Sequence, residues 1–350
     1  MHMADALLAP AVAATMYVAS GAVAGVSVHK LRKDDEPQKL PTMAVTAALV
    51  FAGQMINYTI PGTGSSGHMC GGMLLSALLG PQAGFLSMIV ILAIQCFFFA
   101  DGGVLALGAN VWNMAFYGCF VGYYLIWRPI MRSKLFGEGK GGQRARIILA
   151  SILGCVITLQ LGAFSVVLET SLSGIADLPF KAFVALMQPI HLAIGLIEGL
   201  ITSAVLVFVF ESRPELLRDV NAQAGASKRS LKTVIAILAV VALIVGGGLS
   251  LLASSNPDGL EWALFGNEDA QVQNMGLDEE NFGKSDSAHD TAGAIQEKTS
   301  FLPDYAFSGD EENAAGTTVS GIVGGGMVAG VALLICFAGG FFRKKNQSKG

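Results

Sequence analysis

The sequence predicts an all-α polytopic membrane protein with about nine transmembrane helices, its N-terminus outside the cell and its C-terminus in the cytoplasm. Three observations lead to this prediction. Of the 350 residues, 53% are hydrophobic and only 14% are charged, whereas a soluble chain is about a quarter charged. The apolar residues gather in long runs, and the basic residues gather between particular runs. A lipid bilayer is therefore the expected surrounding of this chain.

Apolar runs mark the candidate spans, because about 20 helical residues cross a hydrocarbon core about 30 Å thick. They are Leu7–Val28, Thr42–Ile60, Met69–Leu79, Phe85–Ala100, Leu107–Ile126, Ile147–Leu168, Phe183–Phe210, Leu231–Ala253 and Val319–Phe342. The run Met69–Leu79 is too short to cross alone. It is either extended by Gly67, His68 and Gly80 or a partial helix shielded by its neighbours. The first run lacks a basic n-region, so we expect it to be retained rather than cleaved as a signal peptide.

Basic residues fix the expected orientation. Most of the 22 Lys and Arg lie in four clusters, namely Lys30–Lys39, Arg128–Arg146, Arg213–Lys232 and Arg343–Lys349. Alternating crossings place all four clusters on one face, which the positive-inside rule makes cytoplasmic. The N-terminus then lies outside, and the expected location is the inner (plasma) membrane with multiple passes.

A polar segment divides the chain into two expected domains. Residues 1–212 form a seven-span domain, residues 213–230 a cytoplasmic linker, and residues 231–350 a two-span domain with an extracytoplasmic loop at 254–318. This loop carries more than half of the 26 acidic residues. We interpret it as a solvated linker that is mobile in part, in preference to a surface that gathers cations.

The first two residues form a candidate metal chelate. The α-amine of Met1, the amide nitrogen of His2 and the Nδ1 atom of its imidazole can close a five-membered and then a six-membered ring around one ion. These rings are nearly coplanar, and a fourth nitrogen would complete the square plane that is typical of Cu(II) or Ni(II). An amide nitrogen loses its proton to late divalent metals and not to Ca²⁺ or Mg²⁺. Affinity alone does not separate nickel from cobalt, and copper would bind more tightly still.

His68 is the candidate fourth ligand, because it follows a glycine-rich loop on the same expected face. Gly62, Gly64 and Gly67 allow the tight turns and the close approach that an ion requires. Taken singly, His68 is better explained as a polar residue before a helix, and His2 as an exposed terminus. Taken together on one face, they favour a metal site.

Several stretches make the chain similar to the NikM/CbiM family, the metal-capturing membrane subunits of energy-coupling-factor nickel and cobalt importers. They are Met1–Pro10, Gly67–Gly72 with Leu79–Pro81, Phe99–Gly103 with Ala106–Asn110, and His191–Gly199. The resemblance covers about residues 1–211. The stretch Asn256–Glu261, between the last two spans, resembles the small NikN/CbiN component, so the chain looks like a fused NikMN protein.

The resemblance implies that Ni(II), or as second choice Co(II), is captured as substrate on the outer face by Met1, His2 and His68 in an N4 square plane. The start His2-Met-Ala-Asp5 differs from the His-Ile-Pro-Asp of many cobalt-type members, which favours nickel. A NikQ/CbiQ-like coupling subunit and a NikO/CbiO-like ATPase are implied as partners, since the sequence lacks a GxxxxGK[ST] motif. No organic cofactor and no nucleic acid are implied.

Other polar residues are candidates for structural support of the site rather than ligands. They are Ser66, Asp101, Asn110, His191 and Glu198. Two alternative functions are an intramembrane metalloenzyme that uses His191 and Glu198, and a stand-alone divalent-cation channel. The sequence has no HExxH motif, a square-planar N4 site offers no in-plane position for a reacting water, and no continuous polar path is visible. We therefore expect a transport subunit and not an enzyme.

Overall fold

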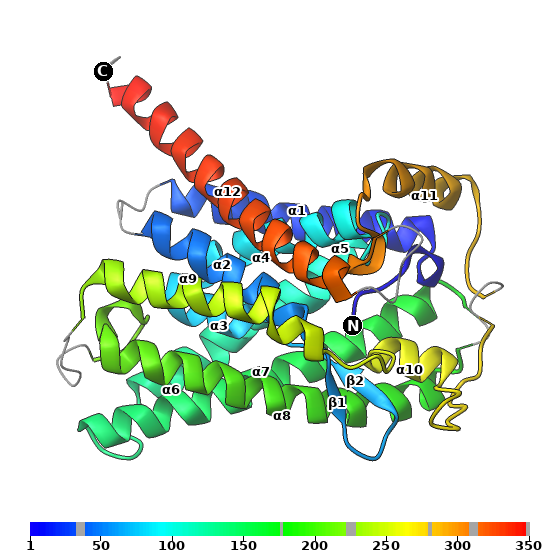
Figure 1. The fold of residues 1–350 in the computed structure, drawn as a ribbon, viewed down its shortest axis with the longest axis horizontal. Coiled ribbons are helices and arrows are strands. Elements are labelled where there is room, and N and C mark those ends of the chain that lie inside the picture. Colours follow the sequence, from blue (N-terminus) through cyan, green and yellow to red (C-terminus); the bar gives the residue numbers. More distant parts are fainter. Residues whose placement is uncertain (33–38, 176–177, 222–228, 279–281, 308–313, 348–350) are drawn as a thin grey trace.

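The computed structural model describes residues 1–32, 39–175, 178–221, 229–278, 282–307 and 314–347. It is a bundle of helices, which confirms an all-α polytopic membrane fold (Figure 1). Among the described residues, 5 helices contain a stretch long and apolar enough to cross a membrane. They are α1 (Pro10–Leu31), α4 (Pro81–Phe99), α7 (Lys140–Leu172), α8 (Phe180–Ser212) and α12 (Ala314–Gln347).

The remaining predicted runs are helical over most of their length, but the run Thr42–Ile60 ends in a strand, since its helix stops at Gln54 and residues Tyr58–Ile60 form β1. Helices α2 (Lys39–Gln54) and α9 (Leu231–Gly247) are apolar but shorter. Helix α5 (Leu107–Asn110), the π-helical segment η2 (Val111–Trp127) and α6 (Arg128–Arg132) follow one another with helical backbone angles at both junctions. This continuous segment matches the predicted run Leu107–Ile126.

The run Met69–Leu79 contains only a partial helix. Helix α3 (Gly72–Leu79) has 8 residues, all buried, and spans about 12 Å. An antiparallel hairpin precedes it, formed by β1 (Tyr58–Ile60) and β2 (Ser65–Gly67). The inner end of α3 lies beside the segment after α8, because the Arg218 amide donates to the Ala77 carbonyl at 2.8 Å. Of the two interpretations, the shielded partial helix is confirmed.

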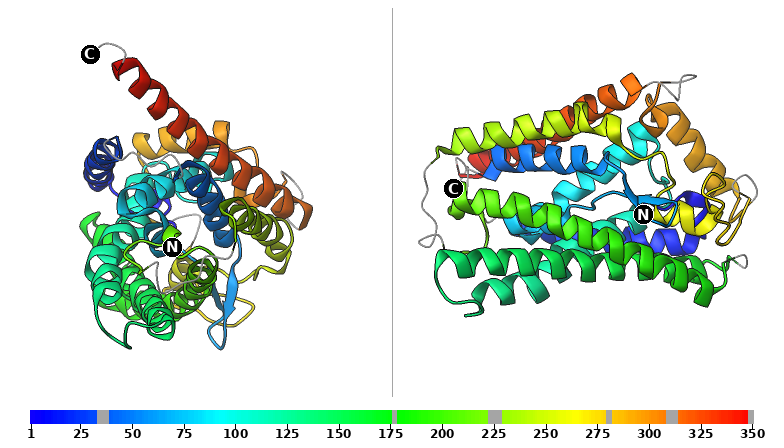
Figure 2. Two further views of the ribbon diagram at one scale, coloured as in Figure 1. Left: turned by 90° about the vertical axis from the view of Figure 1, so that its left-hand side faces the viewer. Right: turned by 60° about the horizontal axis from the view of Figure 1, so that its bottom comes forward.

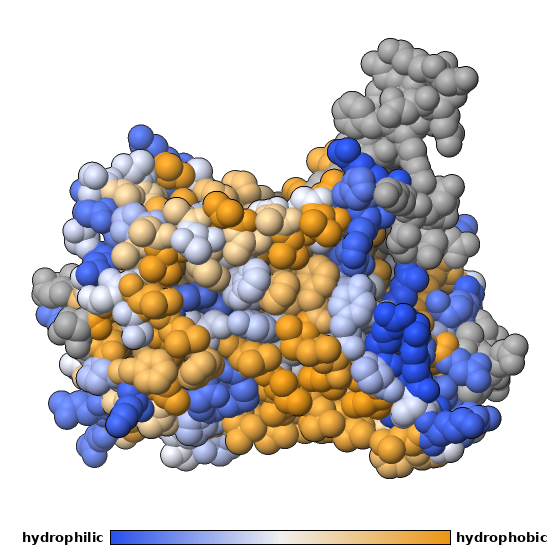
Figure 3. All heavy atoms as spheres, turned by 180° about the vertical axis from the view of Figure 1, so that it is seen from behind, coloured by the Kyte–Doolittle hydropathy of each residue, from blue (hydrophilic) through white to orange (hydrophobic). Residues whose placement is uncertain are grey.

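The elements leave polar groups at two opposite ends. The N-terminus, the hairpin, α10 (Gly259–Phe265) and α11 (Ser287–Thr299) gather at one end, and the α6–α7 turn and the end of α8 lie at the other (Figure 1). The long helices α7 and α8 run side by side between these ends (Figure 2). A broad apolar band covers the middle of the face shown in Figure 3, with polar side chains toward both ends. Such a band is the surface that lipid tails would cover.

Glycines let α7 and α8 approach closely, as in other membrane bundles. A Cβ atom at Gly195 would lie 2.9 Å from the Cα of Val156, and one at Gly199 would lie 2.7 Å from the Cα of Ile152. His191 and Glu198 lie on the buried side of the same helix, each 1% exposed. The close packing of α8 on α7 therefore holds these two polar side chains inside the bundle.

The acidic segment after α9 differs from our interpretation of a solvated linker. Its described residues form η5 (Leu249–Leu252), α10, α11 and η6 (Pro303–Tyr305). Of these, α10 contacts α8, whereas α11 and η6 contact α4. Helices α9 and α12 pack on α2 and on each other. Some residues used in the predictions lie outside the described backbone or side chains: Lys33, Lys39, Lys228, Arg343, Lys344, Lys345 and Lys349.

Candidate metal centre

The first residues are held in place by their main chain. The amide of Met3 donates to Oδ1 of Asn110 at 2.7 Å, and Nδ2 of Asn110 donates to the Met3 carbonyl at 3.1 Å. The amide of Gly103 also donates to that carbonyl, at 2.9 Å. Gly102 has φ +85°, and a Cβ there would lie 2.8 Å from Nδ2 of Asn110. Asn110, a predicted support residue, thus fixes the chain directly after His2.

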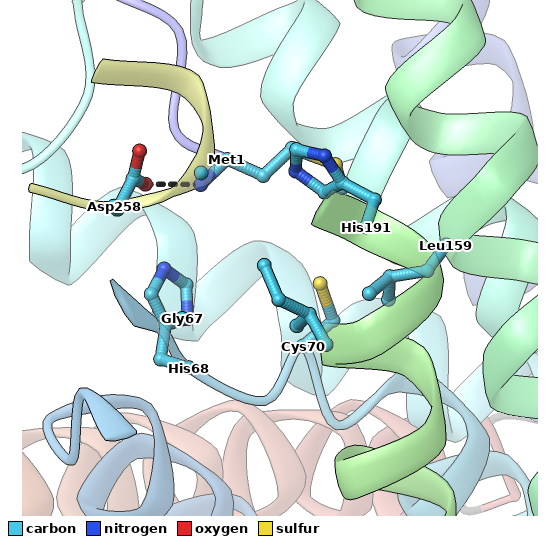
Figure 4. A pocket seen from close by; sticks show the side chains of 9 residues that line it. Met1, Gly67, His68, Cys70, Leu159, His191 and Asp258 are labelled. Carbon is cyan, nitrogen blue, oxygen red and sulfur yellow. Dashed lines mark hydrogen bonds and ion pairs between the residues drawn. The ribbon is translucent and has the colours of Figure 1, made fainter. Parts of the chain in front are cut away.

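The terminal amine of Met1 is buried and forms an ion pair with Asp258 (Figure 4). Asp258 is the N-cap of α10 and also accepts hydrogen bonds from the amides of Leu260 and Glu261, while Glu261 accepts one from the Asp258 amide. This capping box fixes the carboxylate. Burial lowers the pKa of the amine, but Asp258 raises it above its usual value. Burial raises the pKa of the Asp258 carboxyl, but the amine lowers it well below its usual range.

The imidazole of His2 lies between two oxygen acceptors. Its Nδ1 is 3.0 Å from Oδ1 of Asp101, and its Nε2 is 3.2 Å from Oε1 of Gln95. Gln95 donates to Gln54 at 2.9 Å, and Gln54 donates to the Cys70 carbonyl at 2.8 Å. Because the NH₂ group of Gln95 donates to Gln54, the side-chain oxygen of Gln95 faces His2. Two acceptors suit a ring with both nitrogens protonated.

Asp101 is the acidic partner of that ring. Burial raises the pKa of its carboxyl, but the charge of His2 and hydrogen bonds from His2 and Tyr305 lower the pKa to about 2. The Tyr305 hydroxyl donates to Oδ2 of Asp101 at 2.5 Å. Asp101 is therefore a fixed negative charge beside the nitrogen that the predicted chelate uses.

The ring of His68 stacks on the ring of His2, with centroids 5.3 Å apart and planes at 25°. Its Nδ1 lies 3.1 Å from the Met69 carbonyl. A carbonyl only accepts, so Nδ1 carries the proton and Nε2 keeps its lone pair. Burial, followed by the charges of the amine and of His2, lowers the pKa of His68 to about 4. A neutral imidazole with an oriented ring is the form that binds metals.

The other predicted support residues hold neighbouring backbone. Glu198 accepts hydrogen bonds from the amides of Cys70 and Gly71, both at 2.9 Å. Ser66 donates through its hydroxyl to the Asn256 carbonyl at 2.7 Å. His191 lies with its Nδ1 2.8 Å from the Met187 carbonyl.

The structure brings Met1, His2 and His68 together at the end of the molecule that carries the hairpin. A small cavity borders this group, and Met1, His68, Cys70, His191 and Asp258 line it (Figure 4). Within the described part of the chain, no three His, Cys, Asp or Glu side chains form a metal cluster. The predicted set does not need one, since two of its four nitrogens belong to the main chain.

Sequence reasoning missed three residues of this centre: Asp258, Gln54 and Gln95. Each had a signal in the sequence. Asp258 and Glu261 have capping-box spacing in a segment expected on the same face as the amine. The two glutamines interrupt apolar runs, where polar side chains are costly and usually have a function or a partner.

Comparison with known proteins places the chain among metal transport proteins. A family model described as "Cobalt uptake substrate-specific transmembrane region" matches residues 2–216. The chain belongs to this CbiM family. A PDGLE domain matches residues 232–339, and its name spells the residues Pro257–Glu261. Asp258, which pairs with the amine of the CbiM-family domain, is thus part of the PDGLE motif.

The fused arrangement has known counterparts. The putative fused nickel transport protein NikMN of Archaeoglobus fulgidus is 35% identical over 325 residues, covering 93% of this chain and 94% of that protein. The fused nickel transport protein NikMN of Rhodobacter capsulatus is 32% identical and covers 77% and 76%. A truncated transition metal transporter of known structure is 32% identical, with a TM-score of 0.52, and covers 60% of this chain and 99% of that one. The resemblance to fused NikMN proteins is confirmed.

Proposed function

We propose that this chain is the substrate-binding membrane component of an ATP-driven energy-coupling-factor importer, and that it captures Ni(II), or as second choice Co(II), on the outer face. The observation that carries the proposal is the convergence of the Met1 amine, the His2 imidazole and the neutral His68 imidazole beside one small cavity. With the His2 amide they supply four nitrogens for a square plane.

Binding exchanges protons for the ion. The amine of Met1 and Nδ1 of His2 each face a carboxylate, Asp258 and Asp101. When the ion takes these nitrogens, their protons leave, and both carboxylates stay beside the new positive charge. The deprotonated amide of His2 neutralises a further part of that charge. The carboxylates thus hold the ligands before binding and compensate the cation afterwards.

The proposal includes the topology and the domains. We propose about nine crossings, an N-terminus outside and a C-terminus in the cytoplasm of the inner membrane, a metal-binding domain at 1–212, a linker at 213–230 and a NikN/CbiN-like domain at 231–350. The apolar band in Figure 3, with polar side chains toward both ends, supports this arrangement. The third of these crossings contains the run Met69–Leu79, in which α3 is a partial helix shielded by its neighbours.

Transport needs partners that supply energy. We propose a NikQ/CbiQ-like coupling subunit and a NikO/CbiO-like ATPase, because this sequence has no nucleotide-binding motif. The relatives named above are described as transport proteins, which supports a transport subunit in preference to a metalloenzyme. Their names also favour nickel.

Metal titration of the full chain with its native terminus tests the function. We expect about one Ni(II) per chain and the absorption of a square-planar N4 complex. Two residues added before Met1 should abolish this absorption, because the amine leaves the chelate. A single added residue is a poorer test, since an amine, two amides and a third-position histidine can themselves complete an N4 set.

The matched control carries the same two residues after Gly350 and should bind like the unmodified chain. Unchanged absorption in the N-terminally extended chain would rule out the amine as a ligand. Elemental analysis of the same samples distinguishes nickel from cobalt.

A further inference from the structure

His191 lies buried in the bundle and lines the same small cavity as Met1 and His68. The Nδ1 of His191 lies 2.8 Å from the Met187 carbonyl, so this nitrogen donates and Nε2 presents a lone pair. Nε2 is buried and has no hydrogen-bond partner among the residues that the structure describes, and the whole residue is 1% exposed. A buried acceptor that is left unpaired is destabilising, so this orientation calls for a ligand.

Glycines lie at the two points where the chain passes closest to this part of α8. A Cβ atom at Gly259 would lie 3.2 Å from Cε1 of His191, the carbon next to Nε2. A Cβ at Gly67 would lie 2.5 Å from Cγ1 of Ile194, one turn further along α8. Gly259 follows Asp258, and Gly67 precedes His68. The segment that carries Asp258 and the segment that carries His68 therefore each contact α8 through a glycine.

The same cavity is bordered by donors that suit a late divalent metal. His68, with its lone pair on Nε2, and the Met1 amine line it together with His191 and the thiol of Cys70 (Figure 4). Imidazole and thiol are ligands for borderline and soft metals rather than for Ca²⁺ or Mg²⁺. Nε2 of His191 thus faces a cavity whose donor groups suit Ni²⁺ or Co²⁺.

We propose that His191 is an inward ligand for the transported ion. Its Nε2 binds the ion as the ion leaves the chelate of Met1 and His2, while His68 stays bound and acts as the shared ligand of the two positions. The inference rests on the proposed function and adds to it a second position on the route inward. Helix α8 connects this position with the far end of the bundle, and Glu198 on the same helix holds the segment after His68.

Substitution of His191 should reduce the uptake of Ni²⁺ but not its binding to the outer site. In His191→Phe, the full chain with its native terminus should keep the square-planar absorption with Ni²⁺. Uptake of Ni²⁺ by cells that produce the complete transporter should fall roughly tenfold or more, the usual effect of losing a group that tunes a metal site. Wild-type uptake in this variant would overturn the proposal.

A sulfur reporter distinguishes a ligand from a structural residue. His191→Cys replaces the ring by a shorter side chain that ends in a thiol and leaves room for the ion beside it, so Ni²⁺ or Cu²⁺ bound there should give a sulfur-to-metal charge-transfer band that His191→Ala lacks. The matched control is Leu192→Cys, because Leu192 is the next residue on α8 and is 45% exposed. A merely structural role of His191 would not produce this band.

The outcomes are distinct. A band in His191→Cys alone, with reduced uptake in His191→Phe, supports the inward ligand. No band beyond that of Leu192→Cys overturns it, and so does loss of the square-planar absorption in every His191 variant, which would assign the residue to support of the outer site. Absence of that absorption in the unmodified chain would instead contradict the proposed function.

Discussion

At the scale of single residues, two of the nitrogen ligands of the proposed chelate are each paired with a carboxylate. Asp258 holds the amine of Met1, and Asp101 holds the ring of His2. The His68 ring differs, because burial lowers its pKa to about 4 and leaves it neutral. Protons therefore compete with the ion at the amine of Met1 but not at His68, and the affinity for metal should rise with pH.

Asp258→Asn should change this pH dependence in two separable ways. Without the charge of Asp258, burial is the largest effect on the amine and lowers its pKa, so the pH of half-maximal Ni²⁺ binding should move down. At high pH, where the amine is unprotonated in both proteins, the variant lacks one negative charge beside the ion and should bind roughly tenfold more weakly. Isothermal titration over a range of pH measures both effects.

The control for this variant is Asp269→Asn, since Asp269 is an exposed acid of the same segment. It should leave the profile unchanged. An upward shift of the midpoint in Asp258→Asn would show that the ion pair with the amine does not oppose metal binding.

His68→Ala should remove the fourth nitrogen of the plane. We expect water or chloride to take the position, a shift of the visible Ni²⁺ absorption to longer wavelength because the new ligand is weaker, and an affinity at least about tenfold lower. His29→Ala is the matched control, because His29 is an exposed histidine near the end of α1. An identical spectrum in His68→Ala and the unmodified chain would exclude this residue from the plane.

At the scale of elements, the sequence predicted the helices well and their contacts poorly. Long apolar runs identify spans because a bilayer forces every backbone group into internal hydrogen bonds. The same runs do not show that α3 is short, since Gly71 (φ +83°) and Gly80 (φ +86°) bound it through local backbone conformation. Nor could they show that Glu198 of α8 binds the backbone of a loop that lies 127 residues away in sequence.

Glu198→Gln tests this contact between elements. The carboxylate accepts from two amides at once, whereas a side-chain amide offers one acceptor and turns a donor toward the second amide. We expect the loop that carries His68 to loosen, Ni²⁺ affinity to fall roughly tenfold, and the saturated complex to keep its square-planar spectrum.

Glu211→Gln provides the comparison on the same helix, because Glu211 pairs with Arg144 and both are partly exposed. Exposed pairs contribute little, so metal affinity should stay the same. A changed spectrum at saturation in Glu198→Gln would mean that Glu198 acts on the ligands themselves rather than on the position of the loop.

At the scale of the whole molecule, the two domains enclose the centre together. The sequence predicted their order but assigned every ligand and support residue to the first domain. In the structure, the second domain covers the N-terminal segment from several sides, with Asp258 on the amine, the Lys284 amide on the Ala6 carbonyl and His289 on the carbonyls of Asp5 and Leu8. Such contacts join residues more than 250 positions apart, and no local pattern encodes them.

The burial of the proposed ligands restricts how an ion can reach them. Met1 is 5% exposed and His68 is 8% exposed, so an ion from outside reaches the nitrogens only when neighbouring segments move. Strand β1 of the hairpin and the segment before α10 meet at the surface, where Oγ1 of Thr59 donates to Oγ of Ser254 at 2.9 Å. Separation at this contact would free both Ser66 and Pro257, which are joined by a hydrogen bond of 2.8 Å.

A disulfide at that contact should therefore slow metal binding. In the double variant Thr59→Cys/Ser254→Cys, the two side chains are close enough for a bond, and the native cysteines that the structure describes are buried. Stopped-flow absorption should show slower Ni²⁺ binding by roughly tenfold or more when the bond is oxidised, with recovery after reduction, because each opening of the hairpin would now be restrained. The single variants control for the substitutions. Equal rates in the oxidised and reduced proteins would place the path of the ion elsewhere, between the N-terminal segment and α11.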